Sequence, residues 1–199
     1  TGVEVAGSGP GVPPSWLVIS GAAYRVDAIA TSSGAITQGQ TFNVTVDLEN
    51  TGDAPGTISS SSLTFRDGVA DVTSDFSSIA DGGNPTTVNA TSTVQLGFTV
   101  TANPAATRGT ISITANVNGT DVGTGGPVST SGPVPPFDVL VQSPAVLIVD
   151  SVAVTPGDVF QTESLFVTLQ ARNVGEASAN VTSASVTFNT AGVDDTPAY

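Results

Sequence analysis

The chain lacks the residues on which most enzyme chemistry depends. It has no cysteine, histidine, methionine or lysine, and its only cations are four arginines. A nucleophile activated by a neighbouring base needs histidine or another tunable base, so these absences exclude such pairs. Disulfides and lysine–asparagine isopeptide cross-links are excluded as well. Paired carboxylates could still hydrolyse glycosides, but no acid stands beside an aromatic-rich sugar platform. We expect no enzyme activity, no catalytic residue and no cofactor-binding residue.

Positive charge is scarce and negative charge is not. Seventeen carboxylates against four arginines give a net charge of −13, which disfavours nucleic acid or an anionic membrane as a partner. No run approaches the roughly 20 apolar residues of a membrane span. The low charged fraction, 11%, and the wealth of Thr, Ser, Gly, Val and Ala favour an extracellular β-protein. The predicted location is therefore extracellular or on the cell surface.

What the chain does have is an internal repeat. Residues 1–65 align with 124–188 at an offset of 123 without a gap, and 25 of the 65 positions are identical. A fixed period indicates tandem units, and 123 residues are enough for one domain with its own core. The predicted units are residues 1–20, the C-terminal tail of a preceding unit; 21–143, one complete unit; and 144–199, the N-terminal part of the next.

The last predicted piece is incomplete as a sandwich. It keeps the opening strands of the unit but has no counterpart of residues 94–100 or 111–117. Three strands with an open edge are marginal alone and prone to pair with another chain. We expect either that the natural protein continues beyond this segment or that a neighbouring copy supplies the missing strands.

Period-2 alternation is plain in several segments and indicates half-buried strands. In residues 41–49, Phe42, Val44, Val46 and Leu48 fall on one face, and the repeated stretch gives Leu165, Val167, Leu169 and Ala171. Residues 94–100 and 111–117 alternate in the same way. No segment shows helical spacing. Short strands separated by Gly, Pro, Asn and Asp turns predict an all-β fold, tandem immunoglobulin-like antiparallel β-sandwich domains.

Two small motifs recur at equivalent places in the repeat. Asn50-Thr51-Gly52 and Asn173-Val174-Gly175 each follow an amphipathic strand. Asn and Gly tolerate positive φ, so we predict tight turns of that kind at both places. Asp27 and Asp150 also recur, near the start of a strand, where a carboxylate that caps a turn is expected.

These motifs resemble a known family. Residues 145–154 and 161–163, the strand after them and Asn173-Val174-Gly175 are similar to the adhesion-related, CARDB-like immunoglobulin-like repeats of bacterial and archaeal cell-surface proteins. Val26-Asp27 and the segments 39–42 and 50–54 repeat the signature. The resemblance implies a secreted or cell-surface multi-domain protein that serves as a stalk, adhesin or filament, and it transfers no catalytic residue.

An acidic stretch is the one candidate metal site. Calcium takes several oxygen ligands from flexible acidic loops, and the carboxylates in the segment 66–83 are Asp67, Asp71, Asp75 and Asp81. Their spacing matches no defined calcium loop, so a solvated acidic loop is the alternative.

Four sequons are candidate glycosylation sites, at Asn43, Asn89, Asn118 and Asn180. Asn43 lies on the outward face of its predicted strand, where a glycan would fit. In the repeat its place is taken by Phe166, an outward aromatic residue that could mark a contact between chains or pack under a loop.

The sequence favours a structural repeat segment of an extracellular surface fibre, stalk or filament, without catalysis. Its expected partners are copies of itself or adjacent repeats. One alternative is an adhesin or glycan-binding module with surface glycans as partners, and another is a scaffold repeat of a large secreted enzyme. The only cofactor considered is calcium.

Overall fold

The structure is a computed structural model that describes residues 3–5, 15–158, 160, 163–190 and 193–194. The chain divides into two compact units, Thr1–Ser143 and Pro144–Tyr199. Each unit is described here by itself. The predicted division near residue 20 lies inside the first unit and stays a prediction. Among the residues described, no helix is both long and apolar enough to cross a membrane.

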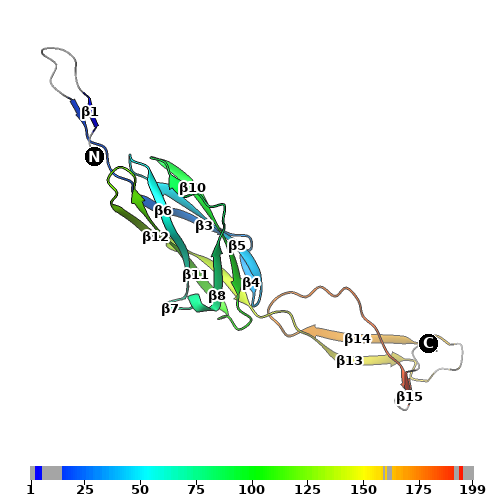
Figure 1. Cartoon of the computed structure of the whole chain (residues 1–199). Helices are drawn as coiled ribbons and strands as arrows, with labels where there is room; N and C mark the ends of the chain where they lie inside the picture. Colours follow the sequence, from blue (N-terminus) through cyan, green and yellow to red (C-terminus); the bar gives the residue numbers. More distant parts are fainter. Residues whose placement is uncertain (1–2, 6–14, 159, 161–162, 191–192, 195–199) are drawn as a thin grey trace, which may run out of the picture. The chain divides into compact units, whose positions relative to one another are not determined.

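Two sheets form a sandwich in the first unit (Figure 1). One sheet has the strand order β3-β5-β10-β8, with bounds Tyr24–Thr31, Thr41–Asn50, Ser92–Ala102 and Phe76–Ala80. The other has the order β4-β12-β11-β6-β7, with bounds Ala35–Thr37, Pro127–Gln142, Gly109–Asp121, Gly56–Asp67 and Ala70–Asp71. A short β9 (Thr87–Val88) pairs with β6, and a 3-10 turn η1 (Thr73–Asp75) precedes β8.

The strand order is that of an immunoglobulin fold. Taken in chain order, the first sheet is the ABED sheet and the second is the CFG sheet, with β7 added beside C as a C′ strand and β4 added beside G. All pairings are antiparallel except that of β4 with β12, which is parallel. The predicted all-β, immunoglobulin-like sandwich is confirmed.

Alternating residues from both sheets meet in one core. Phe42, Val44, Val46 and Leu48 of β5 are at most 3% exposed, and the inward residues of β11 are fully buried: Ile111, Ile113, Ala115 and Val117. Phe65 and Phe76 stack with their ring centroids 4.3 Å apart. The alternation predicted these faces correctly, because a side-chain period of two places every second residue on the same face of a sheet.

The polypeptide enters the sandwich at one end and leaves it at the other. Near the entry, the backbone N–H of Ala22 donates to the carboxylate of Asp121, at the end of β11 where the turn to β12 begins. At the exit, Leu140, Val141 and Gln142 of β12 pair with β4. The chain therefore enters at the end of the sandwich where β12 starts, and it leaves at the opposite end, where β12 ends.

Ahead of the sandwich, β1 (Val3–Val5) and β2 (Ser15–Leu17) pair with each other as an antiparallel two-stranded sheet. The second unit contains a larger hairpin, β13 (Leu147–Thr155) with β14 (Phe166–Asn173), and a small one, β15 (Asn189–Thr190) with β16 (Val193–Asp194).

Candidate functional site

The structural element that the chain builds twice is the hairpin of β3 with β5. In the first unit Tyr24 lies opposite Asn50; in the second, Leu147 lies opposite Asn173, 123 residues further in each strand. The match continues along both strands, including a β-bulge between Val26 and Ala28 that recurs between Val149 and Ser151. The repeat in sequence is thus a repeat in register.

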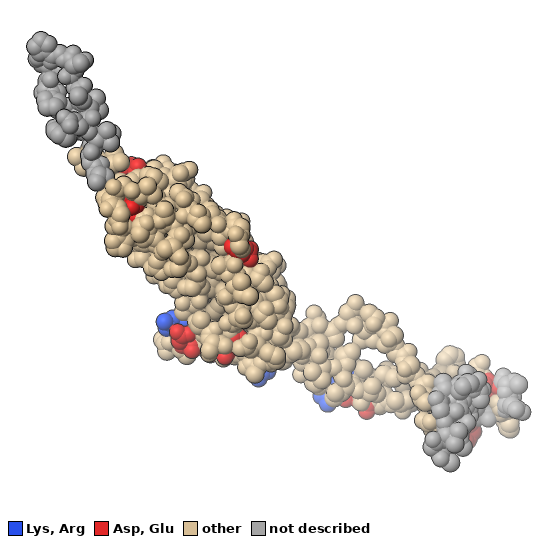
Figure 2. All heavy atoms as spheres, viewed as in Figure 1, with Lys and Arg blue, Asp and Glu red and all other residues tan. Residues whose placement is uncertain are grey.

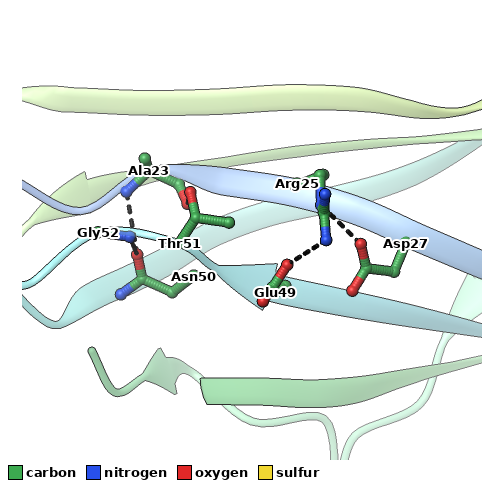
Figure 3. Close-up of polar contacts among 7 residues, drawn as sticks. All are labelled: Ala23, Arg25, Asp27, Glu49, Asn50, Thr51 and Gly52. Atoms are coloured by element: carbon green, nitrogen blue, oxygen red, sulfur yellow. Dashed lines mark hydrogen bonds and ion pairs between the residues drawn. The ribbon is translucent and has the colours of Figure 1, made fainter. Parts of the chain in front are cut away.

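Asn50 ties the end of β5 to three neighbouring segments. Its side-chain oxygen accepts hydrogen bonds from the backbone N–H groups of Ala23, at 3.0 Å, and Gly52, at 3.1 Å (Figure 3). Its amide nitrogen donates to the carbonyls of Ala54, Val88 and Asn89 at 2.8, 3.3 and 3.1 Å. Asn50 is fully buried, so these bonds satisfy groups that have no access to water.

Asn173 repeats the local part of this network. Its side-chain oxygen accepts from the N–H groups of Val146 and Gly175, each at 3.0 Å, and its amide donates to the carbonyl of Ala177 at 2.7 Å. These partners are the residues 123 positions beyond Ala23, Gly52 and Ala54. Unlike Asn50, Asn173 is exposed.

The glycines of the two motifs serve close packing and not a positive φ, so the predicted turn geometry was wrong. Neither Gly52 nor Gly175 has a positive φ. A Cβ placed on Gly52 would overlap the carbonyl oxygen of Gly21, and one on Gly175 would overlap that of Pro144. Gly21 and Pro144 are themselves equivalent positions. Each glycine lets the strand end press against the chain that enters the unit.

Asp27 and Asp150 lie in β-bulges and do not cap turns, so the prediction of turn-capping carboxylates was wrong. Asp27 is the extra residue of the first bulge, and its Oδ1 lies 2.7 Å from Nε of Arg25. The same arginine contacts Glu49 across the hairpin at 2.6 Å (Figure 3). In the second unit Asp150 occupies the bulge and accepts from Arg172 at 2.9 Å.

The arginine has changed strand between the two hairpins. Arg25 lies on β3 opposite Glu49, whereas Arg172 lies on β14 opposite Ile148, at the place that corresponds to Glu49. In both hairpins a guanidinium therefore neutralises the carboxylate of the bulge residue.

A further carboxylate closes the entry end of the first unit. Asp121 is 4% exposed, and it accepts from the N–H of Ala22 and from the N–H and hydroxyl of Thr124. The Ala22 and Thr124 backbone donors hold the pKa of Asp121 below its ordinary value. This role of Asp121 was not predicted from the sequence. One partner, Thr124, lies in the turn that follows Asp121, and the other, Ala22, is 99 residues away.

The acidic stretch is not assembled into one site. Asp71 accepts from the N–H of Thr73 at 2.9 Å, and Asp75 accepts from the hydroxyl and N–H of Thr107 at 2.7 and 2.9 Å. Asp67 is exposed, and Asp81 accepts from the Thr99 hydroxyl at 3.4 Å. Within the described ranges no three such side chains form a group that could hold a metal ion. Calcium binding here stays a prediction, and the melting temperature with and without added calcium tests it.

The four sequon asparagines are all exposed: Asn43, Asn89, Asn118 and Asn180. Asn118 donates to the hydroxyl of Ser60 at 3.2 Å. Their glycosylation stays a prediction. Phe166, which stands where Asn43 stands in the first unit, is 76% exposed, as its outward position predicts.

The face drawn in Figure 2 is mostly uncharged, with acidic and arginine side chains at scattered places. Large exposed apolar side chains are concentrated in the second unit, where they include Val149, Val152 and Leu169. Their equivalents in the first unit, Val26, Ile29 and Val46, are buried. The two hairpins therefore differ in that the second exposes an apolar face whose equivalent in the first is buried.

No family model and no curated protein matches the chain. Among solved structures, it is similar to native alpha-2-macroglobulin from Escherichia coli, spanning domain MG7 to the C-terminus, with 17% identity and a TM-score of 0.44. That similarity covers 68% of this chain and 19% of the macroglobulin chain.

Two further structures are similar at lower scores. The sporulation control protein Spo0M from Bacillus subtilis has 15% identity and a TM-score of 0.36 over 62% of this chain and 50% of its own. The ASH/PapD-like domain 7 of human CEP192 has 15% identity and a TM-score of 0.30 over 58% and 84%. The fold class comes from the strand order and register described above.

Proposed function

We propose that the chain is a structural repeat segment of an extracellular fibre, stalk or filament on a cell surface, built from CARDB-like immunoglobulin-like units. The observation that carries the proposal is the hairpin built twice, 123 residues apart, with the same register, bulge and asparagine hydrogen bonds. What recurs is architecture, since most exposed positions of the two hairpins differ, as Asn43 and Phe166 do.

The path of the chain through the first unit suits a load-bearing role. The polypeptide enters beside Asp121 and leaves at the end of β12, so tension on its ends acts along the sandwich. Strand β4 is parallel to β12 and pairs with its last residues. Tension would therefore load the hydrogen bonds between these strands in shear, where several must break together.

The aromatic residues support a structural role over glycan binding. A sugar platform needs aromatic faces on the surface, but five aromatic side chains are buried in the core of the first unit: Tyr24, Phe42, Phe65, Phe76 and Phe98. The carboxylates of Asp75 and Asp121 are likewise engaged in hydrogen bonds within the fold. We propose no catalysis by this segment.

Single-molecule stretching tests the proposal, and the absence of native cysteine makes the attachment simple. Cysteines introduced at Val18→Cys and Ser143→Cys pull the first unit along its length. Unfolding should then occur at high force and release roughly 40 nm of chain, from the extended length per residue.

The control uses the same protein with another pulling direction. Ser33→Cys with Asp138→Cys attaches the handles at the same end of the two parallel strands, because Leu140 lies opposite Ala35 and its N–H donates to the carbonyl of Gly34. Pulling there separates β12 from β4 one bond at a time, and the unfolding force should be several-fold lower. Equal forces in the two directions would refute the load-bearing role.

A further inference from the structure

The segment Ser20–Ala23, which we call the entry joint, connects the residues ahead of the sandwich to β3. Gly21 stands inside it, and a glycine at a predicted unit boundary is typical of a hinge. The equivalent residue in the repeat is Pro144, and proline has no N–H and a fixed negative φ. Gly21 has no positive φ either. The position therefore does not need the conformational freedom of glycine.

Asp53, in the loop between β5 and β6, holds the residue before this glycine. The hydroxyl of Ser20 donates to Oδ2 of Asp53 at 2.7 Å, and the N–H of Ser20 donates to the same oxygen at 3.1 Å. The N–H of Asp53 donates back to the Ser20 hydroxyl oxygen at 3.1 Å. The hydroxyl and N–H of Ser20 lower the pKa of Asp53, so the carboxylate is ionised at neutral pH and these bonds are charge-assisted. Three bonds fix both the backbone and the side chain of Ser20.

Asp121 holds the residue after the glycine. The N–H of Ala22 donates to Oδ2 of Asp121. The other oxygen, Oδ1, accepts from the N–H of Thr124 at 2.6 Å and from its hydroxyl at 3.0 Å. Asp121 is 4% exposed, so water has little access to these bonds. Because Thr124 fixes the carboxylate, Ala22 is bonded to a group that cannot turn with it.

The end of β5 closes on the same segment. The N–H of Ala23 donates to the Asn50 side chain at 3.0 Å, and the carbonyl of Ala23 accepts from the N–H of Thr51 at 2.8 Å. Gly52 lies so close to the carbonyl of Gly21 that a Cβ would not fit between them. Every residue of the entry joint is thus held, three by hydrogen bonds and Gly21 by close packing.

The second unit repeats the inner part of this arrangement. The N–H of Val146 donates to the Asn173 side chain at 3.0 Å, and its carbonyl accepts from the N–H of Val174 at 2.8 Å. A Cβ on Gly175 would overlap the carbonyl of Pro144. These contacts recur 123 residues after those of the first unit, so they belong to the repeated architecture.

We propose that the entry joint is rigid and fixes the direction in which the preceding chain leaves the sandwich, so that Gly21 is not a hinge. Asp53 is the residue that decides this, since it fastens the chain on the far side of the glycine from β3. Without that bond, Gly21 would be the first free residue and the chain ahead of it would turn there. The inference rests on the proposed function only in taking residues 1–20 as the tail of a preceding repeat.

A flexible joint is the alternative. Asp53 is exposed, so water competes for its carboxylate, and a hinge at Gly21 would open and close these bonds. Two observations favour the rigid joint. Ser20 and Asp53 each donate to the other, so a single water molecule cannot replace the contact. The carbonyl of Gly21 is also packed against Gly52, which restricts the rotation that a hinge requires.

Distances between spin labels on the whole chain test the proposal, and the absence of native cysteine leaves only the introduced sites labelled. Val18→Cys and Val69→Cys carry the labels, because these side chains are 81% and 96% exposed. Pulsed electron–electron double resonance then gives the distribution of the distance between them. The reference pair, Ser129→Cys with Val69→Cys, lies within the sandwich. We expect the first distribution to be no wider than that of the reference pair.

Variants of the hydroxyl–carboxylate pair separate a rigid joint from a flexible one. Asp53→Ala and Ser20→Ala should each widen the distribution from position 18 at least twofold, and the double variant should widen it no further, because both remove the same contact. Asp53→Glu should keep it narrow, since glutamate stands at the equivalent position 176. The matched control is Asp138→Ala, which removes a carboxylate bonded to the Ser112 hydroxyl at 2.6 Å and should change neither distribution.

Three outcomes would overturn the inference. A distribution from position 18 that is already wide in the otherwise native chain would make Gly21 a hinge. An unchanged width in Asp53→Ala would show that this carboxylate does not hold the joint. Equal widening of the reference pair would mean that the whole sandwich had loosened. The stretching experiment depends on the pairing of β4 with β12, so a failure here with directional strength intact leaves the proposed function standing.

Discussion

Asn50 and Asn173 make the same local hydrogen bonds at the ends of equivalent strands, yet Asn50 is fully buried and Asn173 is exposed. The difference lies in what surrounds them. Around Asn50 the sandwich adds the carbonyls of Val88 and Asn89 and excludes water. The pair therefore allows one hydrogen-bond motif to be measured in two environments within one chain.

Replacing Asn50 should cost far more than replacing Asn173. Asn50→Ala leaves buried N–H and C=O groups without partners, at about 1–3 kcal/mol for such a group, so the free energy of unfolding should fall by about 3 kcal/mol. Asn173→Ala exposes its partners to water and should cost less than about 1 kcal/mol. Urea unfolding followed by circular dichroism measures both. Equal losses would show that burial adds nothing to the motif.

A second prediction concerns the close contact at Gly52. Gly52→Ala forces a methyl group against the Gly21 carbonyl and should destabilise the first unit by at least about 1–3 kcal/mol, as overpacking does. Gly82 is the matched control, because a Cβ there meets nothing within 4 Å and its φ is not positive. Thermal melting compares the two variants. A stable Gly52→Ala protein would mean that the strand end can move away from the entering chain.

Stability should fall in acid. The hydroxyl and N–H of Thr107 lower the pKa of Asp75, and the N–H of Ala22 leads those that lower the pKa of Asp121. A carboxylate whose pKa is lower in the folded state stabilises the fold above its unfolded pKa of about 3.9, and that contribution is lost as pH falls through the folded value.

Unfolding midpoints measured from pH 7 to pH 2 check this dependence. They should be nearly constant above about pH 5 and should decline below about pH 4. Asp75→Asn should be less stable than the wild type at neutral pH and should converge with it in acid. A constant difference between the two proteins across the whole range would contradict the assignment.

The bulge ion pairs should contribute little. The Arg25 side chain is 63% exposed, and exposed ion pairs are weak and screened by salt. Arg25→Gln should shift the unfolding midpoint much less than Asn50→Ala does, and the shift should vanish in 1 M sodium chloride. A large shift that persists in salt would show that the guanidinium packs against the bulge.

The inward faces of β5, β10 and β11 could be predicted from the sequence, because alternation in one strand is a local pattern that burial on one face requires. The short strands β4 and β8 were not predicted. Three residues, Ala35–Thr37, are too few to show a period. In β8 the four residues after Phe76 are all exposed, so the strand has no alternation of buried and exposed residues from which it could be predicted.

The roles of Asn50 and Asp27 could be located from the sequence but not explained. Both recur at the 123-residue offset, which marks them as structural. The partners of Asn50 include Val88 and Asn89, almost 40 residues away, and a bulge depends on how two strands align. Such facts depend on register between strands, which no pattern within one strand contains.

The reach of the asparagine motif also bears on the order of folding. Its shared part involves only residues 23–54 in the first unit and 146–177 in the second, so it closes a short loop. Short loops close at low entropic cost, and in the second unit this hairpin is formed with no further strand beside β14 among the residues that the structure describes. The hairpin of β3 with β5 is thus the natural nucleus, and φ-values should be higher there than in the late pairing of β12 with β4. In a polymer of such units, each could begin to fold as its first third leaves the ribosome.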